Sequence, residues 1–180
     1  MTAVLARWNF LPFEAAVDEI LPCCGSRAWA SGMARRRPVS DEAALLAASD
    51  ETWRALADSD WLEAFRSHPR IGESRINESG RSDSWELETT MPRSSAWSEA
   101  EQRAVTVAGD SGKSALARGN QEYEQRFGRI FIVCATGKTP AEILKILERR
   151  LKNDEPTELQ EAANEQRQIT QIRLRKWLQE

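Results

Sequence analysis

The chain contains one histidine, His68, in the segment Ser67-His68-Pro69-Arg70-Ile71-Gly72-Glu73. An imidazole is the side chain best suited to giving and taking protons near neutral pH. Pro69 restricts its own backbone and biases His68 away from helical geometry, while Gly72 permits a tight turn soon after. A stiff, non-helical position of this kind can aim a side chain into a pocket, so we interpret His68 as a candidate catalytic group. The alternative is a surface turn in which His68 only caps a neighbouring group.

Two other charged side chains could take part in the same chemistry. Glu101 ends the pattern Ser98-Glu99-Ala100-Glu101, a capping box in which the helix dipole already favours a first-turn carboxylate. Spacing alone therefore favours a structural role for Glu101. Arg173 lies within a long predicted helix, where charged residues are usually solvated. An arginine near the apolar face of such a helix could instead hold a substrate carboxylate through its planar fork.

Nucleotide and metal sites are not supported by their patterns. Gly137-Lys138-Thr139 is similar to the end of a phosphate-binding loop, but the full pattern needs a glycine at the position of Ile132 and a preceding parallel sheet. One histidine and no Cys-x-x-Cys pair argue against a structural zinc site. Cys23 and Cys24 are adjacent and Cys134 lies in an apolar run, so we expect three buried, reduced thiols.

Helices are expected to position these side chains, because apolar residues recur at helical spacing along most of the chain. Ser40 and Asp41 are cap-type residues at one predicted helix start, Thr139 stands at another, and Gly128 stands at a predicted helix end. Ser59 or Asp60 would cap the short helix that leads to the histidine. The expected helices cover residues 13–21, 28–34, 41–56, 61–65, 99–127 with a pause near 109–112, 140–152 and 158–178, with a turn at 153–157.

One run departs from the helical pattern. Ile130-Phe131-Ile132-Val133-Cys134-Ala135 is the only strongly strand-like segment of the sequence. A single strand cannot form a sheet, so we predict a buried extended segment threaded between helices. The predicted fold class is all-α: a single-domain helical bundle over residues 1–180 with one buried extended segment at about 130–135.

Residues 74–97 have a different composition, rich in Ser, Arg and Glu, with little apolar periodicity. The segment is long for a loop in a compact domain. Beside a candidate site it could form a lid or a wall. Surface disorder is an equally good interpretation.

The length, composition and net charge indicate a globular protein whose charge distribution does not favour binding to a polyanion such as nucleic acid. The chain has 180 residues, of which 29% are charged and 41% apolar, and a net charge of −3. Both signs are mixed along the sequence, so no basic face for nucleic acid is predicted. No apolar run approaches the length of a membrane span, the first residues lack the order of a signal peptide, and the last are not a peroxisomal signal. We therefore expect a soluble, cytoplasmic protein that binds neither nucleic acid nor membranes.

Five segments together carry a resemblance to a known family. They are, in chain order, His68-Pro69-Arg70-Ile71-Gly72, Ser98-x-x-Glu101-Gln102, Asn120-x-x-Tyr123-Glu124-x-Arg126-Phe127-Gly128, Phe131-Ile132-Val133-Cys134-Ala135, and Glu165-Gln166-Arg167-Gln168-Ile169 followed by Arg173-Leu174. Each segment alone is a weak signal, but five in order are specific. The chain resembles the 2-oxo-4-hydroxy-4-carboxy-5-ureidoimidazoline (OHCU) decarboxylase family, from about Phe10 to Leu178.

The resemblance implies an all-α bundle, a homodimer, that converts OHCU to (S)-allantoin and carbon dioxide without a metal or an organic cofactor. This is the third step from urate, after urate oxidase and hydroxyisourate hydrolase, and functional coupling to these two enzymes is a further expectation. The family's catalytic histidine falls on His68. Implied substrate contacts are Pro69, Ser98, Glu99, Ala100, Glu101, Gln102, Phe131, Ile132, Val133, Cys134, Ala135 and Arg173. The segment 74–97 is longer than in shorter relatives. The resemblance therefore does not define the architecture of the pocket on that side.

The loss of carbon dioxide leaves an electron pair that the conjugated C=N and C=O groups of the substrate can accept. We hypothesise that His68 handles the proton of the C4 hydroxyl or protonates the carbanion-like intermediate. Glu101 would orient His68 and tune its charge, or lie near the departing carboxylate. Gln102 and Ser98 would bind ureido or ring amide groups. Arg173 would bind a carbonyl or carboxylate oxygen, and backbone groups of the extended segment would read the planar ring.

Two other interpretations stay open. A lyase acting on a related ureido or imidazoline acid would use the same residues, and substrate profiling would separate it from the first. A non-enzymatic helical interaction module would use the five segments for packing. It would place His68 and Arg173 far apart on the surface, whereas an enzyme would have both facing one solvent-accessible cavity.

Overall fold

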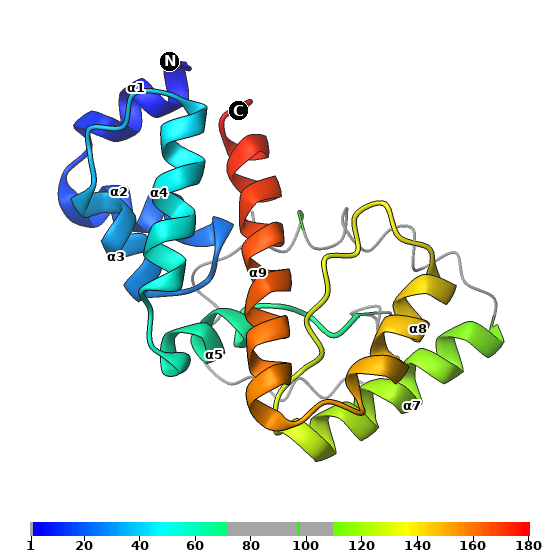
Figure 1. The fold of residues 1–180 in the computed structure, drawn as a ribbon. Helices are drawn as coiled ribbons and strands as arrows, with labels where there is room; N and C mark the ends of the chain where they lie inside the picture. Colours follow the sequence, from blue (N-terminus) through cyan, green and yellow to red (C-terminus); the bar gives the residue numbers. More distant parts are fainter. Residues whose placement is uncertain (1, 72–96, 98–109) are drawn as a thin grey trace, which may run out of the picture. The chain divides into compact units, whose positions relative to one another are not determined.

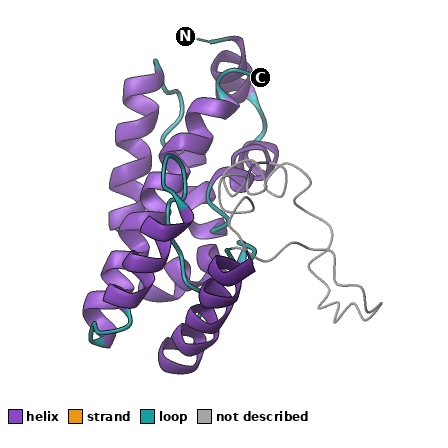
Figure 2. Ribbon diagram, turned by 90° about the vertical axis from the view of Figure 1, so that its right-hand side faces the viewer, coloured by secondary structure: helices purple, strands orange, loops and turns teal. Residues whose placement is uncertain are grey.

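The computed structural model describes residues 2–71, 97 and 110–180 (Figure 1). Across these residues the chain consists of helices and loops, without a strand (Figure 2). The predicted all-α fold class is therefore confirmed. The chain forms two compact units, Met1–Ser67 with Ala163–Glu180, and His68–Ala162. The single domain over 1–180 stays a prediction. None of the helices in the described part is long and apolar enough to cross a membrane.

The first unit is built from short helices and the end of a long one. Its elements are α1 (Ala3–Phe10), α2 (Phe13–Ile20), the 3-10 turn η1 (Leu21–Cys23), α3 (Arg27–Arg35), α4 (Glu42–Arg54), α5 (Asp58–Arg66) and the part of α9 (Glu155–Trp177) that follows Ala162. Of the two predicted cap-type residues, Ser40 and Asp41, the N-cap of α4 is Asp41, because its Oδ1 accepts from the Ala44 N–H at 2.9 Å. Side-chain acceptors thus fix helix starts in this unit.

Two helix starts of this unit differ from the sequence prediction. α1 was not expected, because only Leu5 and Trp8 of its eight residues are buried and so short a pattern gives little periodicity. It begins after Thr2, whose Oγ1 accepts from the Leu5 N–H at 3.2 Å. α5 begins at Asp58, three residues before the predicted start. Asp60 lies inside its first turn and accepts from the Ala57 N–H at 3.3 Å, so it is not the N-cap.

Tryptophan side chains dominate the core of the first unit. Trp8, Trp29 and Trp177 have no exposed surface. The rings of Trp8 and Trp177 meet edge to face with their centroids 5.8 Å apart, an arrangement that aromatic pairs favour. Trp53 donates from Nε1 to the Ala163 carbonyl at 3.0 Å. These contacts hold the end of α9 against α1 and α4 of the same unit.

The second unit contains α7 (Asp110–Phe127), α8 (Pro140–Arg150) and the start of α9. The capping box of α8 is confirmed: Thr139 Oγ1 accepts from the Glu142 N–H, and a Glu142 carboxylate oxygen accepts from the Thr139 N–H at 2.7 Å. Gly128 follows α7 with a positive φ of 63°, as predicted for a helix end.

Two boundaries of the second unit were predicted wrongly. α7 begins at Asp110 and includes Gly112, so the pause expected near 109–112 does not occur at residues 110–112. Residues 98–109, where the helix was expected to begin, lie outside the described part. α9 begins at Glu155 instead of Glu158. Asp154 caps it, because its Oδ1 accepts from the Thr157 N–H at 2.9 Å. A Pro in the first turn is compatible with a helix, so the expected turn is shorter than its composition indicates.

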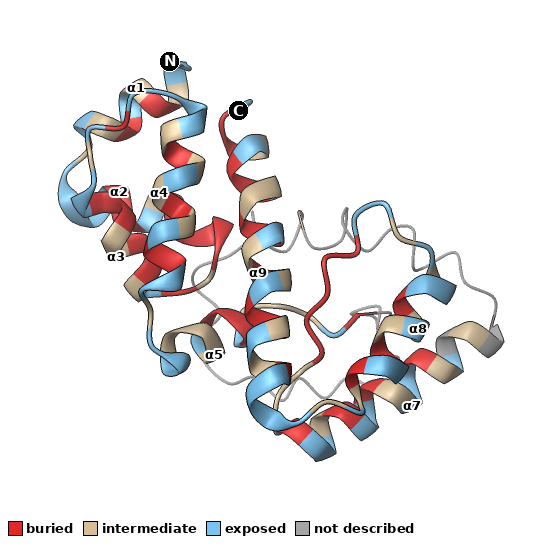
Figure 3. Cartoon of the chain, in the orientation of Figure 1, coloured by how far each residue is buried: buried red, intermediate tan, exposed pale blue. Residues whose placement is uncertain are grey.

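An extended segment crosses the core of the second unit, as predicted. Residues 131–135 are all buried, and Figure 3 shows this stretch between α7 and α8 as buried. Its side chains join one apolar cluster with α7 and α8: Ile71, Leu116, Tyr123, Phe127, Phe131, Val133, Ala135, Ile143 and Leu147. The segment is therefore held by packing instead of by a sheet.

A buried ion pair lies beside this cluster. Arg150 of α8 and Glu158 of α9 have no exposed side-chain surface, and Nε donates to Oε1 at 2.9 Å. Arg150 also donates from Nη1 to the Ile132 carbonyl at 2.6 Å. The Tyr123 hydroxyl of α7 donates to Glu158, and burial raises the pKa of this hydroxyl, which keeps it protonated. One network thus joins α7, α8, α9 and the extended segment.

We predict that Glu158→Ala destabilises the protein by about 3–5 kcal/mol, because it leaves the Arg150 charge buried without its counter-ion. Urea denaturation followed by circular dichroism measures this change. Glu161→Ala is the control, since Glu161 pairs with the exposed Arg149 on the same helices and such pairs contribute about 0–1 kcal/mol. Equal losses in the two variants would contradict the structural role of the buried pair.

Candidate active site

The predicted catalytic histidine lies directly after α5. The Ser67 N–H donates to the Ala64 carbonyl at 3.1 Å and ends the helix. His68 and Pro69 follow in non-helical geometry, and both are half-buried. The prediction of a non-helical position behind a helix is therefore confirmed, whereas the catalytic role of His68 stays a prediction.

The residues after Pro69 are anchored to α7. The Arg70 guanidinium forms a bidentate pair with Glu124, with Nε–Oε1 at 2.5 Å and Nη2–Oε2 at 2.9 Å. Asn120 donates from Nδ2 to the Ile71 carbonyl at 2.9 Å. The Ile71 side chain is buried in the apolar cluster. Three separate interactions thus hold the segment that carries the histidine.

Sequence reasoning gave Asn120 and Glu124 no role beyond the family pattern. Their partners are 49 and 54 positions away in the sequence, at Ile71 and Arg70. The available signal is their i, i+4 spacing, which places both on one face of a helix. That spacing indicates a polar face within an otherwise amphipathic helix, but it does not identify the partner.

The extended segment offers fewer backbone groups than predicted. The Ile132 carbonyl accepts from Arg150, and the Cys134 carbonyl accepts from Lys138 Nζ at 2.6 Å. The Ala135 carbonyl accepts from the Lys138 N–H at 3.0 Å. These three carbonyls already have protein donors, so a ligand that contacts the segment would use its other backbone groups. The substrate contacts at residues 131–135 stay a prediction.

Arg173 lies in the first unit and is buried, with 1% of its surface exposed. The solvated alternative for this arginine is therefore wrong. Burial raises the pKa of the nearby Cys24 thiol to about 12, although hydrogen bonds and the Arg173 charge lower it. Cys24 thus stays a neutral thiol at neutral pH. All three cysteines are buried and free, which confirms the prediction made for them.

The loop after Cys24 packs against the residue that precedes the histidine. Gln166 of α9 donates from Nε2 to the Cys24 carbonyl at 3.1 Å. Gly25 has a φ of +87°, and a Cβ placed on it would lie 2.1 Å from Ser67 Oγ. Glycine is required at this position by both its backbone conformation and the close approach.

Several predicted site residues lie outside the described residues. They are Ser98, Glu99, Ala100, Glu101 and Gln102, together with the predicted loop over 74–96. The roles assigned to them stay predictions.

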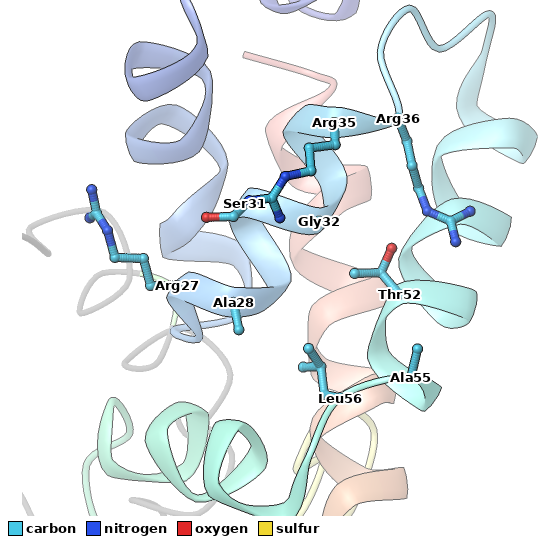
Figure 4. A pocket seen from close by; sticks show the side chains of 9 residues that line it. All are labelled: Arg27, Ala28, Ser31, Gly32, Arg35, Arg36, Thr52, Ala55 and Leu56. Atoms are coloured by element: carbon cyan, nitrogen blue, oxygen red, sulfur yellow. The ribbon is translucent and has the colours of Figure 1, made fainter.

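The described residues form surface hollows, of which two can be placed on named elements. One, of about 560 Å³, is lined by Arg27 and Arg35 of α3, by Arg36 directly after α3, and by residues at the end of α4 and just beyond it (Figure 4). Two of these arginines are paired with carboxylates, Arg27 with Glu14 and Asp18, and Arg36 with Glu51, so the site carries little net charge. The other, of about 370 Å³, lies on α7 beside Arg70. Neither hollow is lined by His68 or Arg173, so neither is the single cavity expected of an enzyme.

Comparison with known proteins gives one consistent family. A family model for OHCU decarboxylase matches residues 9–175. The uric acid degradation bifunctional protein TTL of Arabidopsis thaliana is 36% identical over 92% of this chain, and the 2-oxo-4-hydroxy-4-carboxy-5-ureidoimidazoline decarboxylase of Haloferax volcanii is 27% identical over 94%. The chain spans 48% of the length of the first relative and 93% of the second.

The fold matches a solved structure of the same family. A crystal structure of OHCU decarboxylase in the presence of (S)-allantoin has 32% sequence identity to the chain and a TM-score of 0.73. The match covers 91% of this chain and 99% of that chain. The fold of this chain is therefore similar to that of an OHCU decarboxylase.

We predict that Gly25→Ala destabilises the protein more than Gly137→Ala. Both glycines have positive φ, 87° and 78°, but a Cβ at Gly137 meets no atom within 4 Å. Gly137→Ala is the control, because it introduces only the backbone strain of about 1–2 kcal/mol. The additional loss of stability in Gly25→Ala then measures the crowding against Ser67. Thermal unfolding measures both losses. Equal losses would show that the contact with Ser67 does not restrict this loop.

Proposed function

Because the chain belongs to the OHCU decarboxylase family, we propose that it converts OHCU to (S)-allantoin and carbon dioxide in the degradation of urate. The observation that carries this proposal is the match over residues 9–175. That range contains His68, the extended segment and Arg173. The similarity to a decarboxylase crystallised with (S)-allantoin supports the identity of the product.

The reaction depends more on how the protein orients the substrate than on a strong acid, base or nucleophile. When carbon dioxide leaves, the conjugated C=N and C=O groups of the substrate take up the electron pair. The protein has to hold the carboxylate out of the plane of that system, stabilise the developing charge and protonate one face. Since the electron sink belongs to the substrate, we propose that the reaction needs neither a metal nor an organic cofactor.

His68 is the proposed proton-handling group. It would take the proton of the C4 hydroxyl or protonate the carbanion-like intermediate on one face. Its half-buried, non-helical position supports this role. The anchoring of Arg70 and Ile71 to α7 supports it further, because a general acid or base has to lie within hydrogen-bond reach of its proton.

The other proposed roles follow the family pattern. Arg173 would bind a carbonyl or carboxylate oxygen, and its burial supports a function that a surface arginine would not need. Glu101 would orient His68 or lie near the departing carboxylate, and Ser98 and Gln102 would bind amide groups. Further proposed contacts are Pro69, Glu99, Ala100, Phe131, Ile132, Val133, Cys134 and Ala135.

We also propose a cytoplasmic homodimer that works together with other enzymes of urate degradation. The Arabidopsis relative is named a bifunctional uric acid degradation protein, and this chain spans 48% of its length. That relation supports coupling to the upstream steps, catalysed by urate oxidase and hydroxyisourate hydrolase. A second activity in the same pathway would keep an unstable intermediate close to the decarboxylase.

A coupled chiral assay tests the proposed function. OHCU is generated from urate with the two upstream enzymes, and its decay is followed together with the circular dichroism of allantoin. The chain is expected to accelerate the decay and to give an excess of (S)-allantoin. His68→Asn should reduce the rate by at least about 100-fold while the far-ultraviolet spectrum is retained. No acceleration over spontaneous decay would reject the function, and near-wild-type turnover of His68→Asn would reject its role.

Arg173→Lys tests the proposed binding of a substrate oxygen. Lysine keeps the charge but lacks the planar fork, and loss of a charged hydrogen bond of about 1.5–3 kcal/mol corresponds to about a 10- to 150-fold fall in kcat/KM. Arg175→Lys is the control on the same helix, because Arg175 is exposed and pairs with Glu42. Equal kcat/KM values for the two variants would count against a substrate contact at Arg173.

A further inference from the structure

We infer that α7 positions His68, and that Glu124 and Asn120 are the positioning residues through which it does so. The effect of this positioning on kcat rests on the decarboxylation proposed above. The physical part, that these two side chains fix the orientation of the histidine, is independent of the substrate. Neither residue has to touch the substrate in this role.

The histidine segment depends on side chains for its position. His68 and Pro69 lie outside any helix, so no ladder of backbone hydrogen bonds fixes them. On the C-terminal side of the histidine, the nearest fixed points along the chain are Arg70, held by Glu124, and Ile71, held by Asn120. Pro69 lies between them and the histidine, and its ring restricts φ. Because the segment is held at Arg70 and Ile71 and its backbone is restricted at Pro69, the imidazole of His68 can take few orientations.

The Arg70–Glu124 pair is better suited to orientation than to stability. The two side chains are 49% and 27% exposed, and exposed pairs contribute about 0–1 kcal/mol to folding. Its geometry, however, is bidentate, with both carboxylate oxygens engaged. Two parallel hydrogen bonds fix direction as well as distance. Removal of this pair should therefore disturb the histidine without unfolding the protein.

Asn120 supplies the second anchor by a different means. It is 3% exposed, and its amide donates to the Ile71 carbonyl, a buried backbone acceptor outside the helices. Such an acceptor needs a donor, because an unsatisfied buried carbonyl is costly. An asparagine can provide the donor and an aspartate cannot. Asn120 and Glu124 are four residues apart, so both reach the segment from one face of α7.

The residue next to Glu124 serves the extended segment of the same unit. Tyr123 donates to Glu158, and Glu158 holds Arg150, which donates to the Ile132 carbonyl. Neighbouring residues of one helix therefore hold both the histidine segment and the predicted substrate-contacting segment. Since a helix is rigid over one turn, α7 sets the spacing between them.

A matched control exists in the same unit. Arg149 and Glu161 form a second bidentate pair, with side chains 57% and 25% exposed. Its chemistry and exposure are close to those of the Arg70–Glu124 pair, but it joins α8 to α9 instead of holding the histidine segment. Glu161→Ala therefore removes an ion pair of the same kind without releasing that segment.

The first measurement needs no substrate. The chain has one histidine, so the imidazole signals of a histidine-labelled sample in ¹H–¹³C NMR spectra belong to His68. We expect Glu124→Ala to shift and broaden these signals, and Glu161→Ala to leave them at their wild-type positions. Asn120→Asp should shift them in the same way as Glu124→Ala. Both glutamate variants should melt within about 4 °C of wild type.

The second measurement uses the coupled chiral assay. Glu124→Ala is expected to lower kcat by about 10- to 100-fold, since small misplacement of a catalytic group has effects of this size, with KM changed less than kcat. The excess of (S)-allantoin should fall as well, because a loosened proton donor selects one face less strictly. Glu124→Gln, which keeps one acceptor oxygen, should recover part of both, and Glu161→Ala should match wild type.

The two measurements separate the possible failures. If the NMR signals of Glu124→Ala and Asn120→Asp coincide with those of wild type, the inference is wrong whatever reaction the protein catalyses. If the signals move but kcat and the enantiomeric excess equal those of Glu161→Ala, the positioning has no catalytic role and the inference is also wrong. An inactive wild-type protein would reject the proposed function, while the NMR comparison would still decide whether α7 holds His68.

Discussion

The buried pair of Arg150 and Glu158 is the interaction on which the second unit depends. Neither side chain has exposed surface, so each charge is stable there only with the other and with further hydrogen bonds. Those bonds reach Tyr123 on α7 and the Ile132 carbonyl in the extended segment. A segment without a sheet partner is therefore tied to three helices by one guanidinium and one carboxylate.

Two ion pairs of the second unit have different physical consequences. The buried Arg150–Glu158 pair is costly to break, because either partner alone would be an uncompensated charge in an apolar cluster. The exposed Arg70–Glu124 pair contributes little to folding, since water can solvate each partner. Its effect is on direction, through two hydrogen bonds to a segment that has no helix of its own. Stability and orientation in this unit thus come from separate pairs.

Several features that depend on residues close together in the sequence were predicted correctly, whereas several that depend on residues far apart in the sequence were not. Helix starts at Asp41 and Thr139 were predictable, because their caps join residues three positions apart. The non-helical position of His68 was predictable from Pro69. The anchoring by Asn120 and Glu124 was not, because sequence spacing does not reveal a partner about 50 positions away. The burial of Arg173 likewise depends on packing that a helical pattern leaves undecided.

The proposed reaction explains why anchors should matter as much as the histidine. With the electron sink in the substrate, the protein contributes mainly a proton delivered to one face and a fixed carboxylate direction. Both contributions fail if the imidazole can turn away. The chain restricts it on both sides in sequence: Ser67 is packed against Gly25, where a Cβ would lie 2.1 Å from Ser67 Oγ, and Ile71 is held by Asn120. Stereoselectivity is therefore expected to depend on residues that never contact the substrate.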